Sequence, residues 1–141
     1  MVQRSLSSLI KKIEQDLDQV RDEFLRNVAE DLVASSPVDT GAYVSNHSIT
    51  TSSGAGGTKN SQGRNADTGT AREEALNKLN GQISELPPDA AKVYISNRSP
   101  YANRVEYSGW GRTGPYQVFS SVRSRAGNHL QDAINKVRGT Q

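Results

Sequence analysis

Imidazole and hydroxyl side chains are the first groups to consider as sources of chemistry in this chain of 141 residues. His47 and His129 are its only histidines, and no second histidine or His–acid cluster stands at the spacing of metal ligands. Serines are numerous, but no Gly-x-Ser-x-Gly segment places one on a strand–turn–helix elbow. The chain has no cysteine, which excludes disulfides and thiolate ligands. The sequence therefore predicts no catalytic residue, no metal ligand and no enzyme activity.

A glycine-rich segment at residues 54–59 raises the question of a phosphate-binding loop, because glycines let backbone amides approach a phosphate that Lys59 would neutralise. The phosphate-loop pattern Gly-x-x-x-x-Gly-Lys-Ser/Thr has another spacing and lies between a buried strand and a helix. We therefore expect no bound cofactor. Residues 51–70 are rich in Gly and Ser and poor in apolar side chains, which predicts a flexible loop or hairpin arm that orders, if at all, in an assembly. Its candidate assembly residues are Gly54, Gly56, Gly57, Lys59 and Arg64.

Two acids have distinctive settings. Asp39 lies in a turn sequence and is predicted to cap that turn with its side chain. Glu106 stands among aromatic residues and is predicted to form an ion pair with an arginine such as Arg98 or Arg104. These structural roles account for both acids without a reaction.

A long amphipathic helix is predicted over about residues 5–34, where apolar residues recur at steps of three and four between charged ones. It should end before Ser35 and Ser36, because Pro37 disfavours helical geometry in the residue before it. At ~1.5 Å per residue, such a helix is about 45 Å long. Most of its apolar stripe should lie across the chain's own sheet, and part of it could meet a neighbouring subunit.

The remaining pattern predicts short elements. Strands are expected at 43–51 and 91–96, and a helix should begin at a Thr70 capping box and run to about Ile83. Further helices are expected over 100–107 and from Pro115 to about Arg138, the latter weakened by Gly127. The predicted fold is α+β, with the long N-terminal helix and the C-terminal helix packed on a small, mainly antiparallel sheet. We expect a single domain over 1–141.

Two turn-rich segments stand about sixty residues apart, at 36–41 and 97–110. Each segment contains proline, which fixes the backbone angle φ, and glycine, which allows the positive φ that tight turns often need. The predicted turn residues are Pro37, Asp39, Thr40, Gly41, Pro100 and Gly109. Aromatic and charged residues around the second segment suit a protein interface, where Tyr and Trp combine apolar area with a polar edge. The interface candidates are Tyr101, Arg104, Glu106, Tyr107, Trp110 and Tyr116.

Composition also favours an assembly component. Only 33% of the residues are hydrophobic, so the core is small and association would bury surface that one subunit leaves open. The formal charge is +2, and basic residues are scattered rather than gathered in a stripe. The basic residues of the C-terminal third are Arg98, Arg104, Arg112, Arg123, Arg125, Lys136 and Arg138. They keep open a less favoured alternative, a DNA-binding accessory protein. No apolar window reaches the ~18 residues that would span a membrane.

The sequence Ser-Pro-Val-Asp-Thr-Gly at 36–41, followed by Asn-x-x-Pro-Tyr-Ala-x-x-Val-Glu-Tyr at 97–107, resembles the signature of the tail-completion, or neck, proteins of long-tailed bacteriophages. The order of predicted elements is similar to that family over residues 28–137.

The resemblance implies a structural virion protein that joins the tail to the head connector. It would form a homo-oligomeric ring, with six subunits expected from tail symmetry, at the head-proximal end of the tail. Implied partners are the tail-tube or terminator protein and the head connector, stopper or portal complex, with DNA passing through the lumen and no membrane. Synthesis in the host cytoplasm, docking of the 51–70 loop on an adjacent ring and subunit contacts through 101–110 are expected. Terminator and stopper roles stay open as alternatives.

Overall fold

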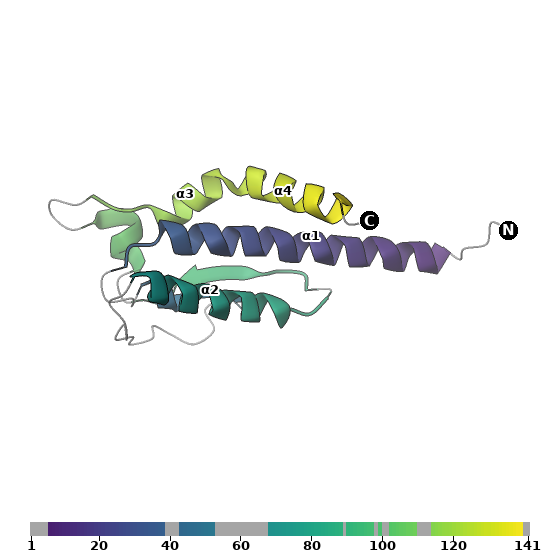
Figure 1. Ribbon diagram of the computed structural model, residues 1–141, viewed down its shortest axis with the longest axis horizontal. Helices are drawn as coiled ribbons and strands as arrows, with labels where there is room; N and C mark the ends of the chain where they lie inside the picture. The colour runs from purple at the N-terminus through teal and green to yellow at the C-terminus, as the bar shows by residue number, and fades with distance from the viewer. Residues whose placement is uncertain are drawn as a thin grey trace.

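Helix α1 (Leu6–Ser35) is the central element of this computed structural model, which describes residues 6–38, 43–52, 68–88, 90–97, 99, 102–109 and 114–139. Figure 1 shows α3 (Val118–Ser124) and α4 (Ala126–Gly139) along one side of α1, and α2 (Thr68–Ser84) with the strands along the other. The predicted long helix is confirmed. It ends at Ser35, immediately before the Ser36–Pro37 turn.

The core consists of two hydrophobic clusters on different sides of α1. The first joins α1 to α2 and the first strand, and contains Leu25, Ala29, Val33, Val44, Ile49, Ala71, Ala75, Leu79 and Ile83. The second joins α1 to α3 and the segment before it, and contains Val28, Leu32, Tyr43, Val105, Val118 and Val122. Residues three and four apart share a helix face, so the same two turns of α1 can serve both clusters with different residues.

Strands β1 (His47–Thr50) and β2 (Tyr94–Asn97) form the antiparallel sheet of the described residues, with His47 opposite Asn97 and Ile49 opposite Ile95. The α+β fold class is thereby confirmed. The expected strand at 43–51 is too long, because residues 44–46 form a 3₁₀ turn, η1 (Val44–Asn46). The amide of Asn46 donates to the carbonyl of Tyr43 at 3.1 Å, a local bond that replaces strand pairing.

Two other element boundaries differ from expectation. Helix α2 begins at Thr68, so the predicted cap Thr70 lies inside its first turn. No helix begins at Pro115: the amides of Tyr116 and Gln117 donate to the carbonyl of Val105, at 2.8 and 3.2 Å, and hold this stretch against the preceding segment. Gln117 has a left-handed backbone (φ 51°), and α3 starts only after it.

The C-terminal helix is interrupted at Arg125, two residues before the glycine that was expected to weaken it. The interruption lets the Arg125 guanidinium reach Asp31 on α1, with Nε and Nη2 each 2.8 Å from a carboxylate oxygen. His129 Nε2 lies 2.7 Å from the same carboxylate, and Lys136 Nζ lies 3.0 Å from Glu23. These polar contacts, together with buried Ala133 and Val137, fix α4 along α1.

Asp31 is the acid on which this attachment centres. Hydrogen bonds from Arg125, and then from His129 and Ser35, hold the pKa of its carboxyl well below the usual range, against the opposing effect of burial. The Ser35 hydroxyl donates to Asp31 and accepts from Arg125, at 3.0 and 3.1 Å. A catalytic serine would instead bond to the imidazole, so the contacts of Ser35, His129 and Asp31 are those of a helix attachment.

A matched pair of leucine truncations tests the core assignment. Leu79→Ala removes a side chain that is 0% exposed and should cost about 2–5 kcal/mol of unfolding free energy, because a cavity remains in the first cluster. Leu17→Ala removes one that is 63% exposed and should change stability by less than about 0.5 kcal/mol. Urea denaturation measures both. Equal losses from the two variants would contradict the placement of the core.

Candidate interaction surface

The two turn-rich segments of the sequence meet at the buried side chain of His47. Its Nε2 lies 2.7 Å from the hydroxyl of Ser36, in the first segment. Its Nδ1 lies 3.1 Å from the side-chain nitrogen, Nδ2, of Asn97, in the second. Asn97 also donates to the Tyr43 carbonyl at 2.8 Å and accepts from the Ser99 amide at 2.8 Å. One imidazole therefore connects the end of α1 to the end of β2.

The protonation of His47 follows from its partners. The Asn97 side-chain nitrogen can only donate, so Nδ1 of His47 must accept and carries no proton. The proton of the neutral ring then lies on Nε2, which donates to the Ser36 hydroxyl. Ser36 in turn donates to the carbonyl of Leu32. Both ring nitrogens are used in fixing structure, and neither is available to a substrate.

Burial keeps this imidazole neutral. His47 is 1% exposed and packs edge-on against the rings of Tyr43 and Phe119, with centroid separations of 5.0 and 5.7 Å. Loss of hydration, with a smaller effect of the positive charge of Lys78, lowers the pKa of His47 from 6.5 to about 3. A charged ring could not keep its bond from Asn97, because Nδ1 would then be a donor too.

The segment after Asn97 forms a corner that is bonded to the start of α3. Its central part, η2 (Arg104–Ser108), is a π-helical turn, in which the amide of Gly109 donates to the carbonyl of Arg104 at 2.7 Å. Gly109 has φ 65° and ψ −163°, a conformation that side chains resist, which explains the need for glycine here. The Arg104 Nε donates back to the carbonyl of Gly109 at 3.1 Å.

Glu106 caps α3. One carboxylate oxygen accepts from the amide of Phe119 at 2.7 Å, and the other accepts from the amide and hydroxyl of Ser120, at 3.1 and 2.7 Å. The first amides of a helix have no partner within it and favour a negative group. Arg104 Nε donates to the carbonyl of Gly109, and Arg98 is outside the described residues, so the expected ion pair of Glu106 with an arginine stays a prediction.

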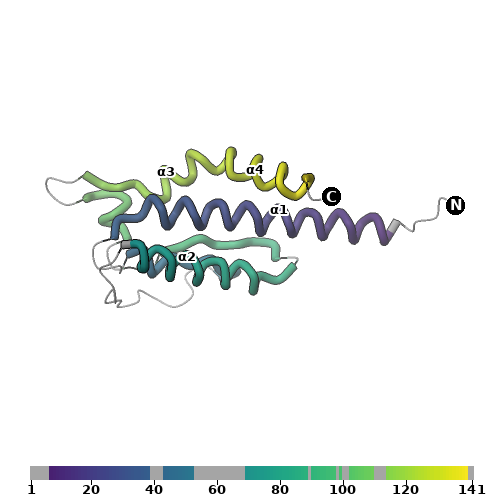
Figure 2. Tube along the Cα trace, viewed as in Figure 1, coloured from purple at the N-terminus to yellow at the C-terminus, as the bar shows by residue number. Residues whose placement is uncertain are grey.

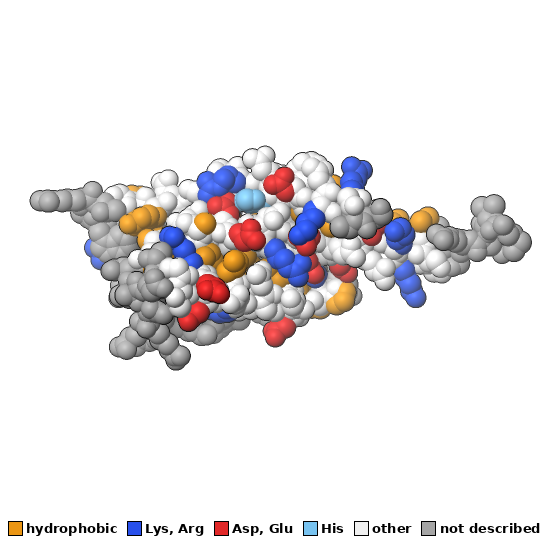
Figure 3. Space-filling model, viewed as in Figure 1, with side chains coloured by type: hydrophobic (Ala, Val, Ile, Leu, Met, Phe, Trp, Pro, Cys, Tyr) orange, Lys and Arg blue, Asp and Glu red, His pale blue; other side chains and the backbone are white. Residues whose placement is uncertain are grey.

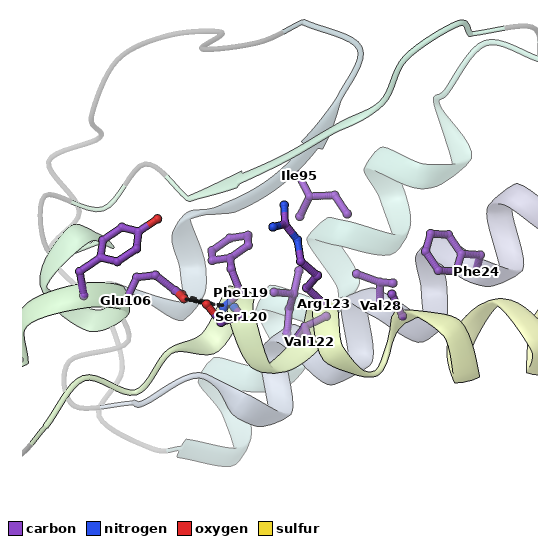
Figure 4. A pocket seen from close by; sticks show the side chains of 11 residues that line it. Phe24, Val28, Ile95, Glu106, Phe119, Ser120, Val122 and Arg123 are labelled. Carbon is purple, nitrogen blue, oxygen red and sulfur yellow. Dashed lines mark hydrogen bonds between the residues drawn. The ribbon is translucent and has the colours of Figure 1, made fainter.

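A groove of about 320 Å³ opens beside this capped corner, between α1, β2, η2 and α3. Figure 4 shows Phe119, Ser120, Val122 and Arg123 of α3 along it, facing Phe24 and Val28 of α1, with Ile95 of β2 nearby. Its wall is mostly apolar, and the Arg123 side chain is the basic group that lines it. The groove is therefore suited to an apolar side chain or short segment of a partner rather than to a charged metabolite.

Two of the interface candidates project from the corner. Tyr107 is 75% exposed and Tyr116 is 46% exposed, while Glu106 is buried and bonded to α3. Large aromatic side chains that remain exposed beside an apolar groove are typical anchors in protein interfaces. Arg104 belongs to the same turn and its side chain is also exposed.

The other predicted site residues lie outside the described residues. These are Asp39, Thr40, Gly41, Pro100, Tyr101, Trp110, Gly54, Gly56, Gly57, Lys59 and Arg64, together with most of the predicted 51–70 loop. Pro37 is described and stands two residues after the end of α1 at Ser35. The sequence prediction missed His47, whose one signal was its unusual place in a strand.

Among the described residues, no group of three or more His, Asp or Glu side chains could hold a metal ion, and no helix is both long and apolar enough to cross a membrane. Comparison of the chain with protein-family models, curated proteins and solved structures finds no match. The geometry of the corner is therefore the main guide to function.

The neutral His47 predicts how stability depends on pH. Between pH 6.5 and about 3 the unfolded chain binds a proton that the folded protein does not, so stability is full above pH 6.5 and falls as the pH decreases. The slope should approach but not exceed ~1.4 kcal/mol per pH unit. Urea denaturation between pH 7 and 5 measures it, above the range in which most carboxylates titrate. His47→Gln should be less stable at pH 7 but show a flatter pH slope; equal slopes would contradict this assignment.

Capping by Glu106 predicts a second effect on stability. Glu106→Gln turns one acceptor into a donor that faces amide donors, and should cost about 1–3 kcal/mol of unfolding free energy. Glu74→Gln, on an exposed position of α2, is the matched control and should cost less than about 0.5 kcal/mol. Urea denaturation midpoints at pH 7 compare the two. A Glu106 variant as stable as its control would show that the cap contributes nothing.

Proposed function

We propose that this protein is a structural component of the neck of a long-tailed bacteriophage, a ring-forming tail-completion protein that joins the tail to the head connector. The supporting observation is the His47 connection: the two sequence segments that carry the resemblance are bonded to one side chain. Catalytic residues line a solvent-accessible cavity. Ser36 and Asn97 belong instead to a hydrogen-bond network around a buried imidazole.

The exposed face of that corner supports an assembly role. Tyr107 and Tyr116 extend from a backbone held by the Gly109 turn and the Glu106 cap, so their positions are fixed before any partner binds. Pre-organised aromatic groups bind without a large loss of conformational freedom. A neighbouring copy in the ring, the tail-tube or terminator protein, and the connector, stopper or portal complex are the partners that the proposal assigns.

Among the residues that the structure describes, the DNA-binding alternative finds no specific support. Arg125 and Lys136, two of the basic residues that suggested it, form ion pairs with Asp31 and Glu23 of α1. Figure 3 shows basic and acidic side chains interspersed over the visible face of the body. A duplex held by phosphate contacts needs a basic stripe. In the proposal, DNA passes through the lumen without sequence-specific binding. Terminator and stopper roles are variants of the same neck assignment.

The exposed tyrosines provide the test. In the phage that encodes the protein, Tyr107→Ser combined with Tyr116→Ser should leave a folded protein but let heads and tails accumulate separately, because both substitutions remove apolar area from the proposed contact. Electron microscopy counts joined particles and locates the protein as a ring at the neck. Leu130→Ser, at an exposed leucine of α4, is the matched control and should give normal particles. A normal number of joined particles from the tyrosine variant, or location of the protein elsewhere on the virion, would contradict the proposal.

A further inference from the structure

The sheet has two outer edges, and they differ in what binds them. At the edge of β1, the backbone amide of Ile49 donates to the side-chain oxygen Oε1 of Gln82, on α2, at 2.8 Å. This N–H therefore points away from β2. In an antiparallel pair, residues whose N–H and C=O point outward alternate with residues that bond across the ladder. The pair of residues 49 and 95 is therefore outward-pointing, and the pairs 48–96 and 50–94 are those that bond across the ladder.

This register leaves the outer edge of β2 open. Ile95 lies opposite Ile49, so its backbone N–H and C=O point to the side of β2 that faces away from β1. Among the residues that the structure describes, none accepts a hydrogen bond from that amide or donates one to that carbonyl. All four residues of β2 are partly exposed. An unpaired strand edge is a template for another strand, and proteins commonly cover such edges.

The open edge lies on the side of the sheet where the groove is. Gln82 covers the β1 edge, whereas Ile95 of β2 lines the groove together with residues of α3. Figure 4 shows the Arg123 side chain extending from α3 toward Ile95. Figure 2 shows the chain entering β2 after α2 and continuing from it to the corner. A segment bound along this edge would therefore lie between β2 and α3, with Phe24 and Val28 of α1 beneath it.

The charge in the groove indicates what kind of segment binds there. Arg123 forms no ion pair or hydrogen bond with the described residues. Glu106 lines the same groove, but both of its carboxylate oxygens accept hydrogen bonds from the start of α3. A guanidinium favours a carboxylate from a ligand. A second copy joined through its own β2, Tyr-Ile-Ser-Asn, would bring another Arg123 and no acid from that strand. The segment that fits therefore comes from a different protein.

We propose that the outer edge of β2 binds an extended segment of a partner protein as a third, antiparallel strand, with an apolar side chain in the groove and an acidic one at Arg123. The partner residue opposite Ile95 exchanges both backbone hydrogen bonds with it, and its side chain lies on the same face, toward the groove. Residues two places away share that face, ~7 Å along the strand, within reach of a long arginine side chain. This inference rests on the assembly role proposed above and gives it a mode of recognition, strand addition.

Amide hydrogen exchange of the full chain, followed by NMR, tests whether the edge is open. The amide of Ile95 should exchange much faster than that of Ser96, which bonds across the ladder to β1. The Ile95 rate should not depend on protein concentration. Protection of Ile95 in dilute protein would show that the chain itself covers the edge. Protection that grows with concentration would show that a second copy does. Either result would overturn the proposal.

A synthetic peptide, acetyl-Thr-Glu-Thr-Leu-Thr-Glu-Thr-amide, is the probe for strand addition. Its leucine is meant for the position opposite Ile95, with a glutamate two residues to each side. We expect a dissociation constant of about 1 mM or lower, and slower exchange of the Ile95 amide when the peptide is bound. N-methylation of the leucine should abolish binding, because its N–H points at β2. N-methylation of the next threonine, whose N–H points away, should not. Equal binding by the two methylated peptides, or no binding by the parent peptide, would overturn the proposal.

Reversal of charge tests the acidic character of the partner. Arg123→Glu should weaken binding of the acidic peptide at least threefold and favour a peptide with lysine in place of both glutamates. Arg138→Glu, at an exposed position of α4, is the matched control and should leave binding unchanged. Unaltered binding by the Arg123 variant would overturn an acidic partner. These measurements do not use the phage, so they can fail while the tyrosine variant still separates heads from tails, and the two proposals are tested independently.

Discussion

Burial of the neutral His47 ring is the constraint on which the corner of this protein depends. Nδ1 of the ring accepts a hydrogen bond from Asn97, and Nε2 donates one to Ser36. The end of β2 and the end of α1 must therefore lie a fixed distance apart. The register of the sheet, with residue 47 opposite residue 97, is the one that permits both bonds. The π-helical turn and the start of α3 follow from this point along the chain.

Much of the fold was predictable because it depends on periodicity. The three-and-four spacing in α1 and the Tyr-Ile pair of β2 specify helix and strand locally. Helix α1 lies close to its expected bounds, whereas β2 (Tyr94–Asn97) begins three residues later than the strand expected at 91–96. The strand at 43–51 was predicted too long, since the bond between Asn46 and Tyr43 that forms η1 has no periodic signal. The delayed start of α3 likewise depends on the Val105 carbonyl, a partner eleven or more residues away in sequence.

The candidate site was less predictable than the fold. Tyr107 and Tyr116 could be chosen as exposed aromatic residues by their type and their glycine-rich surroundings. The roles of His47 and Glu106 could not, because each is defined by partners that only the fold brings near: Asn97 for the imidazole, and the amides of Phe119 and Ser120 for the carboxylate. A glutamate among arginines suggests an ion pair. A helix is predicted after it, but nothing in the sequence places the first amides of that helix beside the carboxylate.

The position of α1 between two core clusters also affects how the chain folds. Synthesis makes this helix before the elements that pack on it, and its attachments come from far along the chain: Asp31 binds Arg125, 94 residues later, and Val28 packs with Val118 and Val122. A helix without tertiary contacts is marginal in water, and contacts of large sequence separation form slowly. The side of α1 that forms the second cluster therefore stays open until α3 has been made. Once α3 and α4 arrive, the two clusters share one helix and should form and unfold as a single cooperative unit.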